Sequence, residues 1–515
     1  MKQRNVVVKN GFFGILSQVV KIVFTFLTRS LFIHYIGIEI LGINSTFASV
    51  LSTLSVTELG FQTAVAFSLY KPLHEGNKDE INDIMNIFRI VYRCVGVFFV
   101  VASFVLLPFL KYILKDIQVT RTVWLYFLLQ SAASAFTYFI AYKRTLLYAD
   151  QKDYIAKSID TVVTIVFNAL QCIALVLLRD YITYLVLRIV QVVVSNLFIH
   201  LYCTKHYSFL HPSLLNKGKL REIWENVKNV FVGRIAGYIY RATDNIIISS
   251  FVGTVSVGLL VNYTTITTSL KNLTNSLLTS MTPIIGHYLV DENSEIKRKK
   301  VFDLYAYVMF FVASATVIPL LVLEDDFISW WVGRDMVMEW SIPLLIAIDY
   351  YIHLVHGCLL EFVNGAGLFK VEKKVEVAGA ITNIVTSLVL VQFMGIPGVL
   401  LGTVISQLVF WFGRSWIVFF RCLGQHRKDY FMYWIRNLIC AAVFCGMFFA
   451  CSKIYKLLSI QGLLPRVIIG GLLCEMLILV GVPLIFSKTV EQKQAIRIIR
   501  GMVGEKLKDI RRKAK

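Results

Sequence analysis

The sequence predicts an all-α polytopic membrane protein of about 14 transmembrane helices, with two six-helix lobes as a parallel repeat plus two C-terminal helices. Hydrophobic residues make up 57% of its 515 residues and charged residues only 16%, whereas soluble domains average about 25% charged. Apolar runs of about 20 residues, enough to cross a hydrocarbon core of about 30 Å, recur along the chain. Two segments in different halves also resemble each other.

The apolar runs define the predicted elements in order. The first run has no small-residue cleavage site after it, so we expect a retained helix and not a cleaved signal peptide. The predicted spans are residues 11–33, 41–69, 87–110, 122–142, 155–178, 181–203, 227–250, 256–285, 302–323, 341–363, 375–394, 397–420, 432–454 and 463–486. They divide the chain into an N-terminal six-helix lobe, a C-terminal six-helix lobe, two additional helices and a basic amphipathic cytoplasmic tail, at residues 1–215, 216–425, 426–487 and 488–515.

The distribution of lysine and arginine predicts the orientation. The two termini and the loops on their side hold 37 of these cations, and the opposite loops hold eight. The positive-inside rule therefore places both termini in the cytoplasm. The loop with Lys453, Lys456 and Arg466 is basic although it should lie outside, and is the exception to this pattern.

The repeat rests on two matches in the same order. Residues 8–14 (VKNGFFG) resemble 227–233 (VKNVFVG), and residues 35–42 (YIGIEILG) resemble 251–258 (FVGTVSVG) with both glycines aligned. The offsets of 219 and 216 residues differ by only three. Six predicted spans separate the copies, so both halves would insert with the same orientation.

We single out seven of the cations inside predicted spans, where each costs roughly 2.5–3.5 kcal/mol on insertion scales. Such residues usually face a bundle interior or a water-filled cavity, which indicates a pathway for an anionic substrate. For Arg188 and Arg414 we expect structural pairing instead. The seven cations are Lys21, Arg29, Arg188, Arg234, Arg241, Lys271 and Arg414.

Three stretches carry a resemblance to a known family. They are the opening VKNGFFGILSQ, the run YIGIEILGINSTFASVLSTLSVTELGFQTAVAFSLYKPL and the run DNIIISSFVGTVSVGLLVNYTTI. With these the chain resembles the O-antigen and capsule repeat-unit (Wzx-type) flippases of the multidrug/oligosaccharidyl-lipid/polysaccharide exporter superfamily. The resemblance implies alternating access by two lobes, which move undecaprenyl-pyrophosphate-linked oligosaccharide from the cytoplasmic to the outer leaflet for surface polysaccharide synthesis.

The resemblance also implies a setting. The protein would lie in the bacterial cytoplasmic membrane among membrane lipids, with the polysaccharide polymerase and glycosyltransferases of the same pathway as possible partners. No nucleic acid is expected, because the basic residues mostly flank spans or lie in the tail. No cofactor is expected beyond H⁺ or Na⁺ as a coupling ion, and the nine scattered cysteines show no metal-binding spacing.

A pyrophosphate requires cations in a partly dehydrated cavity. Lys21 and Arg29 are eight residues apart on one predicted span, and Arg234 and Arg241 are seven apart on its repeat equivalent, so each pair lies about two turns apart on one side of a helix. Lys271 joins them as a candidate within a polar run. Internal ion pairing remains the alternative for this set, and Arg29 could instead snorkel to the membrane surface.

Two predicted spans are too polar to face lipid. Their hydroxyls and amides suit sugar hydroxyls in a cavity, and they equally suit hydrogen bonds between helices. The candidate lining residues are Asn44, Ser49, Ser52, Glu58, Asn262, Thr267 and Asn272.

Intramembrane acids and histidines are candidates for ion coupling. Asp349, His353 and His356 fall at i, i+4 and i+7 of one predicted span, which places a carboxylate and two imidazoles on one face. The alternative is a hydrated face with satisfied histidines. Asp244, three residues after Arg241, is a further candidate or a neutralising partner of that arginine.

Several other function classes fit poorly. The sequence has no P-loop, HExxH or GxSxG motif, so we do not expect an enzyme. A membrane glycosyltransferase or polymerase would need a large catalytic loop, and none is found. A multidrug/ion antiporter of the MATE type would favour acids over cations in its cavity. The lipid II flippase of cell-wall synthesis stays an open alternative.

Overall fold

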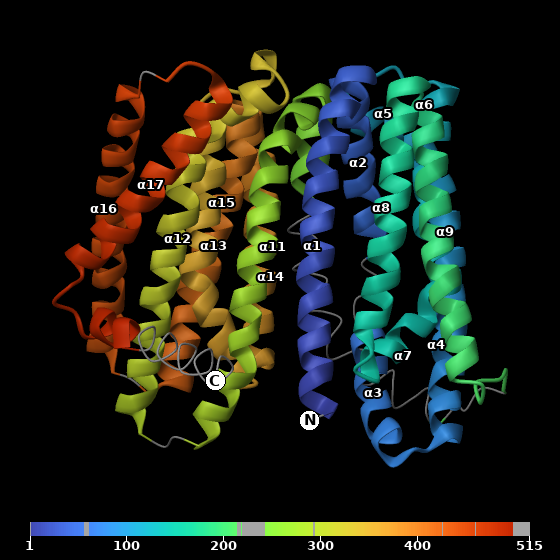
Figure 1. The fold of residues 1–515 in the computed structure, drawn as a ribbon, viewed down its shortest axis with the longest axis horizontal. Helices are drawn as coiled ribbons and strands as arrows, with labels where there is room; N and C mark the ends of the chain where they lie inside the picture. Colours follow the sequence, from blue (N-terminus) through green and yellow to red (C-terminus); the bar gives the residue numbers. More distant parts are fainter. Residues whose placement is uncertain are drawn as a thin grey trace, which may run out of the picture. The chain divides into compact units, whose positions relative to one another are not determined.

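The computed structural model describes residues 2–55, 61–213, 218, 243–291, 294–424, 426–458 and 460–497 (Figure 1). Every element within these ranges is helical. Eleven of the described helices are long and apolar enough to cross a membrane. The predicted all-α polytopic class is therefore confirmed, and the chain is an integral membrane protein.

The chain forms two compact units, residues 1–261 and 262–515. Most helices of the first unit follow the predicted spans, and short 3₁₀ segments extend two of them, but the structure describes two helices, Ile38–Leu54 and Phe61–Glu75, where one span at 41–69 was predicted. Its elements are α1 (Lys2–Tyr35), α2 (Ile38–Leu54), α3 (Phe61–Glu75), α4 (Lys78–Leu106), η2 (Leu107–Phe109), α5 (Leu110–Ile113), α6 (Arg121–Ile140), η3 (Ala141–Lys143), α7 (Arg144–Ala149), α8 (Asp153–Leu177) and α9 (Tyr181–His206).

Helix α11 (Thr254–Asp291) begins in the first unit and continues into the second. It is 38 residues long but too polar to count among the eleven apolar helices. The remaining elements are α12 (Glu295–Trp331), η4 (Arg334–Met336), α13 (Ser341–Gly365), α14 (Phe369–Met394), α15 (Ile396–Ile417), η5 (Val418–Cys422), α16 (Arg427–Leu457) and α17 (Leu463–Ile485).

Within the first unit, the start of α11 packs against α2 through two glycines. A Cβ atom on Gly42 would lie 2.1 Å from the Thr254 carbonyl oxygen, and one on Gly258 would lie 2.5 Å from the Ile38 carbonyl oxygen. The predicted repeat aligns Ile38 with Thr254 and Gly42 with Gly258, so the contact is reciprocal. Only glycine allows two helix backbones to approach this closely.

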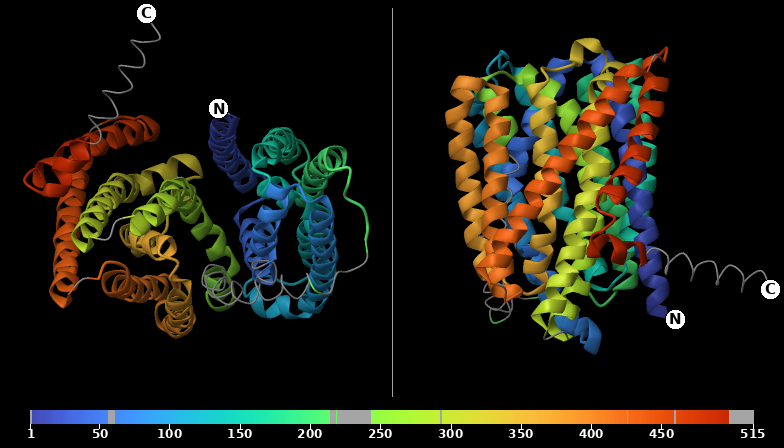
Figure 2. Two further views of the ribbon diagram at one scale, coloured as in Figure 1. Left: turned by 90° about the horizontal axis from the view of Figure 1, so that it is seen from below. Right: turned by 90° about the vertical axis from the view of Figure 1, so that its left-hand side faces the viewer.

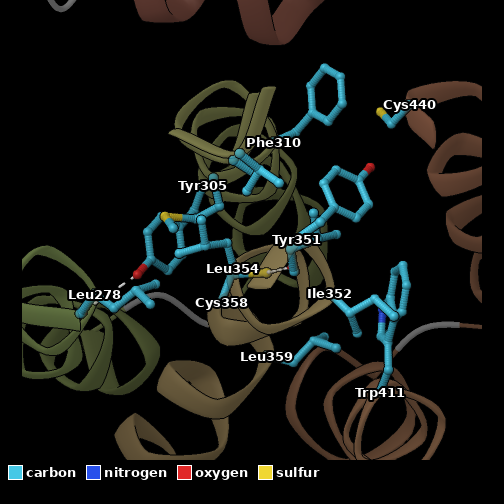
Figure 3. Packing of buried hydrophobic residues seen from close by; sticks show 14 of the residues in the cluster. Leu278, Tyr305, Phe310, Tyr351, Ile352, Leu354, Cys358, Leu359, Trp411 and Cys440 are labelled. Atoms are coloured by element: carbon cyan, nitrogen blue, oxygen red, sulfur yellow. Dashed lines mark hydrogen bonds between the residues drawn. The ribbon is translucent and has the colours of Figure 1, made fainter. Parts of the chain in front are cut away.

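The core of the second unit surrounds α13, which is the most enclosed of the eleven apolar helices. Tyr351, Leu354 and Cys358 of α13 lie among side chains of α11, α12, α15 and α16 (Figure 3). Helix α17 runs obliquely beside α12 (Figure 2). A polar residue on α13 therefore lies inside the bundle and must find its partners on neighbouring helices.

Candidate functional site

Asp349 is the centre of a polar site in the second unit. The Lys271 ammonium on α11 lies 2.5 Å from Asp349 Oδ2. The Gln407 amide on α15 donates to Asp349 Oδ1 over 2.9 Å. Both carboxylate oxygens are thus occupied, and the charge that a lone lysine would bring into the span is neutralised.

The same amide links Asp349 to His356. Because Gln407 uses its Nε2 to donate to Asp349, its Oε1 is an acceptor, and His356 Nε2 lies 2.8 Å from it. His356 Nε2 therefore carries the proton, and Nδ1 is the acceptor nitrogen. Arg414 Nη1 lies 3.5 Å from that Nδ1, where an N–H donor is required. Each hydrogen bond in this series thus determines which atom of the next residue donates and which accepts.

A second buried ion pair ends the series. Arg414 Nε donates to Glu372 Oε1 over 2.7 Å, and the two side chains are only 8% and 5% exposed. The structural pairing expected for Arg414 is confirmed. Arg188, for which we expected the same, forms no ion pair within the described part of the chain.

The series runs across four helices, α11, α13, α15 and α14, with an ion pair at each end and two neutral groups between. We name it the polar chain, and its members are Lys271, Asp349, Gln407, His356, Arg414 and Glu372. An amide between two titratable groups can reverse its orientation when either changes its protonation state. Protonation of Asp349 would therefore change the hydrogen bond that Gln407 makes to His356.

His353 separates from the other two members of its predicted face. Its Nε2 lies 3.0 Å from Asn275 Oδ1 on α11, while His356 turns toward α15. The rings of the two histidines are 6.1 Å apart. Asp349 and His356 thus share one hydrogen-bonded network through Gln407, and His353 lies beside it.

In the first unit, Lys21 of α1 lines a polar cavity of about 350 Å³. Arg144 and Asp160 also line it, and they form a two-pronged ion pair with both N–O distances at 2.8 Å. Ser195 donates to the same carboxylate over 2.5 Å. Asp160 is therefore committed to other partners, and Lys21 makes no ion pair within the described ranges.

Arg29, two turns further along α1, lines a separate cavity of about 160 Å³. Asn44, Asn168 and Tyr184 supply further polar groups to its wall. The two cations predicted on this helix therefore both face cavities within the first unit. Neither side chain is packed into an apolar core.

The polar residues of α2 mostly bond to protein groups. Tyr181 donates to Asn44 Oδ1 over 3.0 Å, and Asn245 donates to Ser49 Oγ over 3.0 Å. Ser52 donates to the Ser49 carbonyl within its own helix. The interhelical alternative accounts for Asn44 and Ser49, although Asn44 also lines the cavity with Arg29.

The polar residues of α11 differ from one another. Asn262 and Thr267 are buried, whereas Asn272 is exposed. Asp244 lies half-buried just before this region. Three predicted site residues, Glu58, Arg234 and Arg241, lie outside the described residues.

The sequence matches the family described as "Polysaccharide biosynthesis protein" over residues 7–289. The chain belongs to this family. No curated protein sequence matches it significantly. Several solved structures are also similar to this member of the polysaccharide biosynthesis protein family.

Two of these structures show what the fold resembles. A structure titled lipid II flippase MurJ, inward closed conformation, has a TM-score of 0.69 at 12% identity, and the match covers 94% of this chain and 98% of that one. An inward-facing multidrug resistance MATE family transporter of the MOP superfamily has a TM-score of 0.61 at 13% identity, with 78% and 93% covered. At these identities the likeness shows that the chain shares the fold of these two proteins.

Reasoning from sequence missed three groups that complete these sites. Gln407 and Glu372 complete the polar chain, and Asp160 holds Arg144 at the cavity of Lys21. Gln407 is an amide within an apolar run, which is a usable signal. Glu372 and Asp160 lie near predicted span ends, where a carboxylate is common and indicates no partner.

Proposed function

We propose that this protein is a flippase for undecaprenyl-pyrophosphate-linked oligosaccharide, moving repeat units from the cytoplasmic to the outer leaflet for surface polysaccharide synthesis. The family supports the pathway, and the transporter fold supports translocation. The observation that carries the substrate class is the pair of cations on α1, Lys21 and Arg29, each lining a polar cavity. A cation in such a cavity suits a phosphate group.

Which cations contact the substrate depends on which of them are already paired with a carboxylate. Lys271 and Arg414 are neutralised by Asp349 and Glu372, whereas Lys21 has no ion pair within the described ranges. An anionic substrate gains most from a cation that has no competing carboxylate. We therefore assign first contact with the pyrophosphate to Lys21 and Arg29, together with Arg234 and Arg241 on the repeat-equivalent span. Lys271 becomes available only when Asp349 releases it.

The polar chain is our candidate for coupling to an ion gradient, with H⁺ or Na⁺ as the coupling ion. A proton or a sodium ion at Asp349 would compete with Lys271 for the carboxylate and break the link between α11 and α13. Gln407 would pass the change to His356. Asp349 is thus the primary ion-coupling residue, His356 the second, and His353 and Asp244 are subsidiary candidates.

The proposed location is the bacterial cytoplasmic membrane, with both termini in the cytoplasm, as the positive-inside rule predicts. Pathway partners would be the polymerase and glycosyltransferases that use or supply the lipid-linked unit. A lipid II flippase is the second candidate, because the MurJ fold matches over nearly all of both chains. Both substrates share a lipid pyrophosphate, so the cationic cavities do not separate them.

A cellular assay tests the proposal. A strain lacking this gene should accumulate lipid-linked repeat units and lose surface polysaccharide, and the wild-type gene should restore it. Lys21→Gln should fail to restore it at normal membrane levels, whereas Lys111→Gln, at an exposed lysine in α5, should succeed. Rescue of a strain lacking its lipid II flippase, without rescue of surface polysaccharide, would favour the second candidate.

A further inference from the structure

The first unit carries a second cluster of cations, whose members do not themselves line the cavities of Lys21 and Arg29. Arg89 and Arg93 lie one turn apart on α4, and Lys143 lies in η3, which contacts α4, α6 and α9. Lys143 Nζ lies 3.4 Å from His200 Nε2 and donates to Thr204 Oγ1 over 2.6 Å, both on α9. Arg89 is close enough to Lys143 to repel its charge. Lys143 thus lies beside the imidazole of His200, with Arg89 near it and Arg93 one turn further along α4.

No described carboxylate neutralises this cluster. The nearby acids have other partners: Asp160 binds Arg144 and Ser195, and Asp150 binds Lys152 and Tyr207. Arg89 Nε and His200 Nδ1 are both buried without a hydrogen-bond partner within the described residues. Like charges one helical turn apart also repel each other. An anion bound near these groups would relieve this repulsion.

The depth of the cluster in the membrane follows from the sequence of α4 and its extension. Residues 94–110 contain no charged side chain, and 17 helical residues span about 26 Å, close to a hydrocarbon core of about 30 Å. Arg93 is therefore the last charge before the hydrocarbon, and Arg89 lies one turn outside it. This places the cluster at the level of lipid phosphates, on the side where the positive-inside rule places the cytoplasm.

The neighbouring surface is apolar and exposed. Val97, one turn beyond the exposed Arg93 on the same face of α4, is exposed, and so is Phe98 next to it. Leu197 and Leu201 present the same kind of surface on α9. In a membrane-spanning chain, such a surface contacts acyl chains. An anion seated on the cluster would therefore have lipid tails available directly beside it.

We propose that Arg89, Arg93, Lys143 and His200 form a binding site for the phosphate headgroup of an anionic phospholipid in the cytoplasmic leaflet. The two guanidinium groups offer paired donors to phosphate oxygens, and the ammonium adds a point charge. A cation that only snorkels extends to the headgroups as a single side chain, without being held by other protein groups. Here the buried Lys143 is held in place by α9, so the site is assembled before lipid arrives. This site does not depend on the proposed transport function.

Native mass spectrometry of the detergent-purified full chain, titrated with dioleoylphosphatidylglycerol or dioleoylphosphatidylcholine, tests the proposal. The wild type should retain the anionic lipid preferentially. Arg93→Gln should weaken its binding roughly fivefold, since a cation near an anionic lipid contributes about a factor of that size. Arg93→Lys should retain most of the affinity. Lys111→Gln, at the opposite end of the same helical segment, should bind as the wild type does.

Arg93 is exposed, so neither of its variants should disturb folding. Three results would overturn the proposal. The first is equal binding of the two lipids by the wild type, and the second is unchanged binding by Arg93→Gln. The third is displacement of the anionic lipid by inorganic phosphate at the same concentration, which would show a free-anion site that makes no use of the acyl chains.

Discussion

Asp349 holds Lys271 at 2.5 Å, and this ion pair joins α11 to α13 inside the second unit. Its two side chains are 25% and 15% exposed. The pair at the other end of the polar chain, Arg414 with Glu372, is far more enclosed. We therefore expect the first pair to open during function and the second to remain closed.

Removing one partner of the Asp349–Lys271 pair should destabilise the protein more than removing both. Asp349→Asn leaves a partly buried ammonium without its counter-ion, and breaking a fully buried pair in this way costs about 3–5 kcal/mol, less here because of the exposure. Asp349→Asn with Lys271→Met should recover most of the loss. Thermal unfolding in detergent measures this. The exposed pair Lys71–Glu75 is the control, and Lys71→Met should change the midpoint little.

Gln407→Leu should break the polar chain at its middle. The substitution leaves Asp349 Oδ1 and His356 Nε2 without their shared partner, at a cost of about 1–3 kcal/mol for a buried polar group. Thermal unfolding gives the stability, and transport measured with and without a proton gradient gives the coupling. Full stability together with unchanged gradient dependence would show that the amide carries neither role.

Gly42→Ala should lower stability, because its Cβ would meet the Thr254 carbonyl oxygen at 2.1 Å. Gly446→Ala is the matched control: Gly446 is also helical, but a Cβ there meets nothing within 4 Å. Alanine is favoured over glycine in helices by about 1 kcal/mol, so the control should be neutral or slightly stabilising. The thermal unfolding midpoints of the two variants should therefore move in opposite directions, and equal midpoints would contradict the close approach.

Asp180 should make the protein less stable in acid. Partial burial disfavours its ionised form, but hydrogen bonds from the Thr183 hydroxyl and amide and from the Ile182 amide outweigh this and lower the pKa of Asp180 below its usual value. Its stabilisation is therefore fully present above the unfolded pKa of about 3.9 and is lost as pH falls through the folded pKa.

The pH dependence of unfolding separates the charge of Asp180 from its capping role. Asp180→Asn keeps a cap of α9 and should lose part of the change in midpoint between pH 7 and pH 3. Asp180→Ala should lose about 1 kcal/mol already at pH 7. A wild-type midpoint that does not fall in acid relative to Asp180→Asn would contradict the assignment.

Apolar run length sufficed to predict the helical class, because a chain in lipid has few ways to satisfy its backbone. The helical spacing of Asp349 and His356 likewise predicted that both lie on one face of a helix. It could not predict that Gln407 links them, because the link depends on how α15 packs against α13. Likewise, Lys21 and Lys271 look alike in sequence, and only the packing distinguishes a cavity lysine from a paired one.

Flipping by the purified protein tests the central claim most directly. Proteoliposomes would contain a fluorescent undecaprenyl-pyrophosphate-linked oligosaccharide, and a membrane-impermeant quencher would report its exposure. We predict that the wild type exposes inner-leaflet substrate, that Lys21→Gln greatly slows this, and that Lys111→Gln does not. Equal rates for wild-type, Lys21→Gln and protein-free liposomes would contradict the assignment of this chain as a flippase for lipid-pyrophosphate substrates.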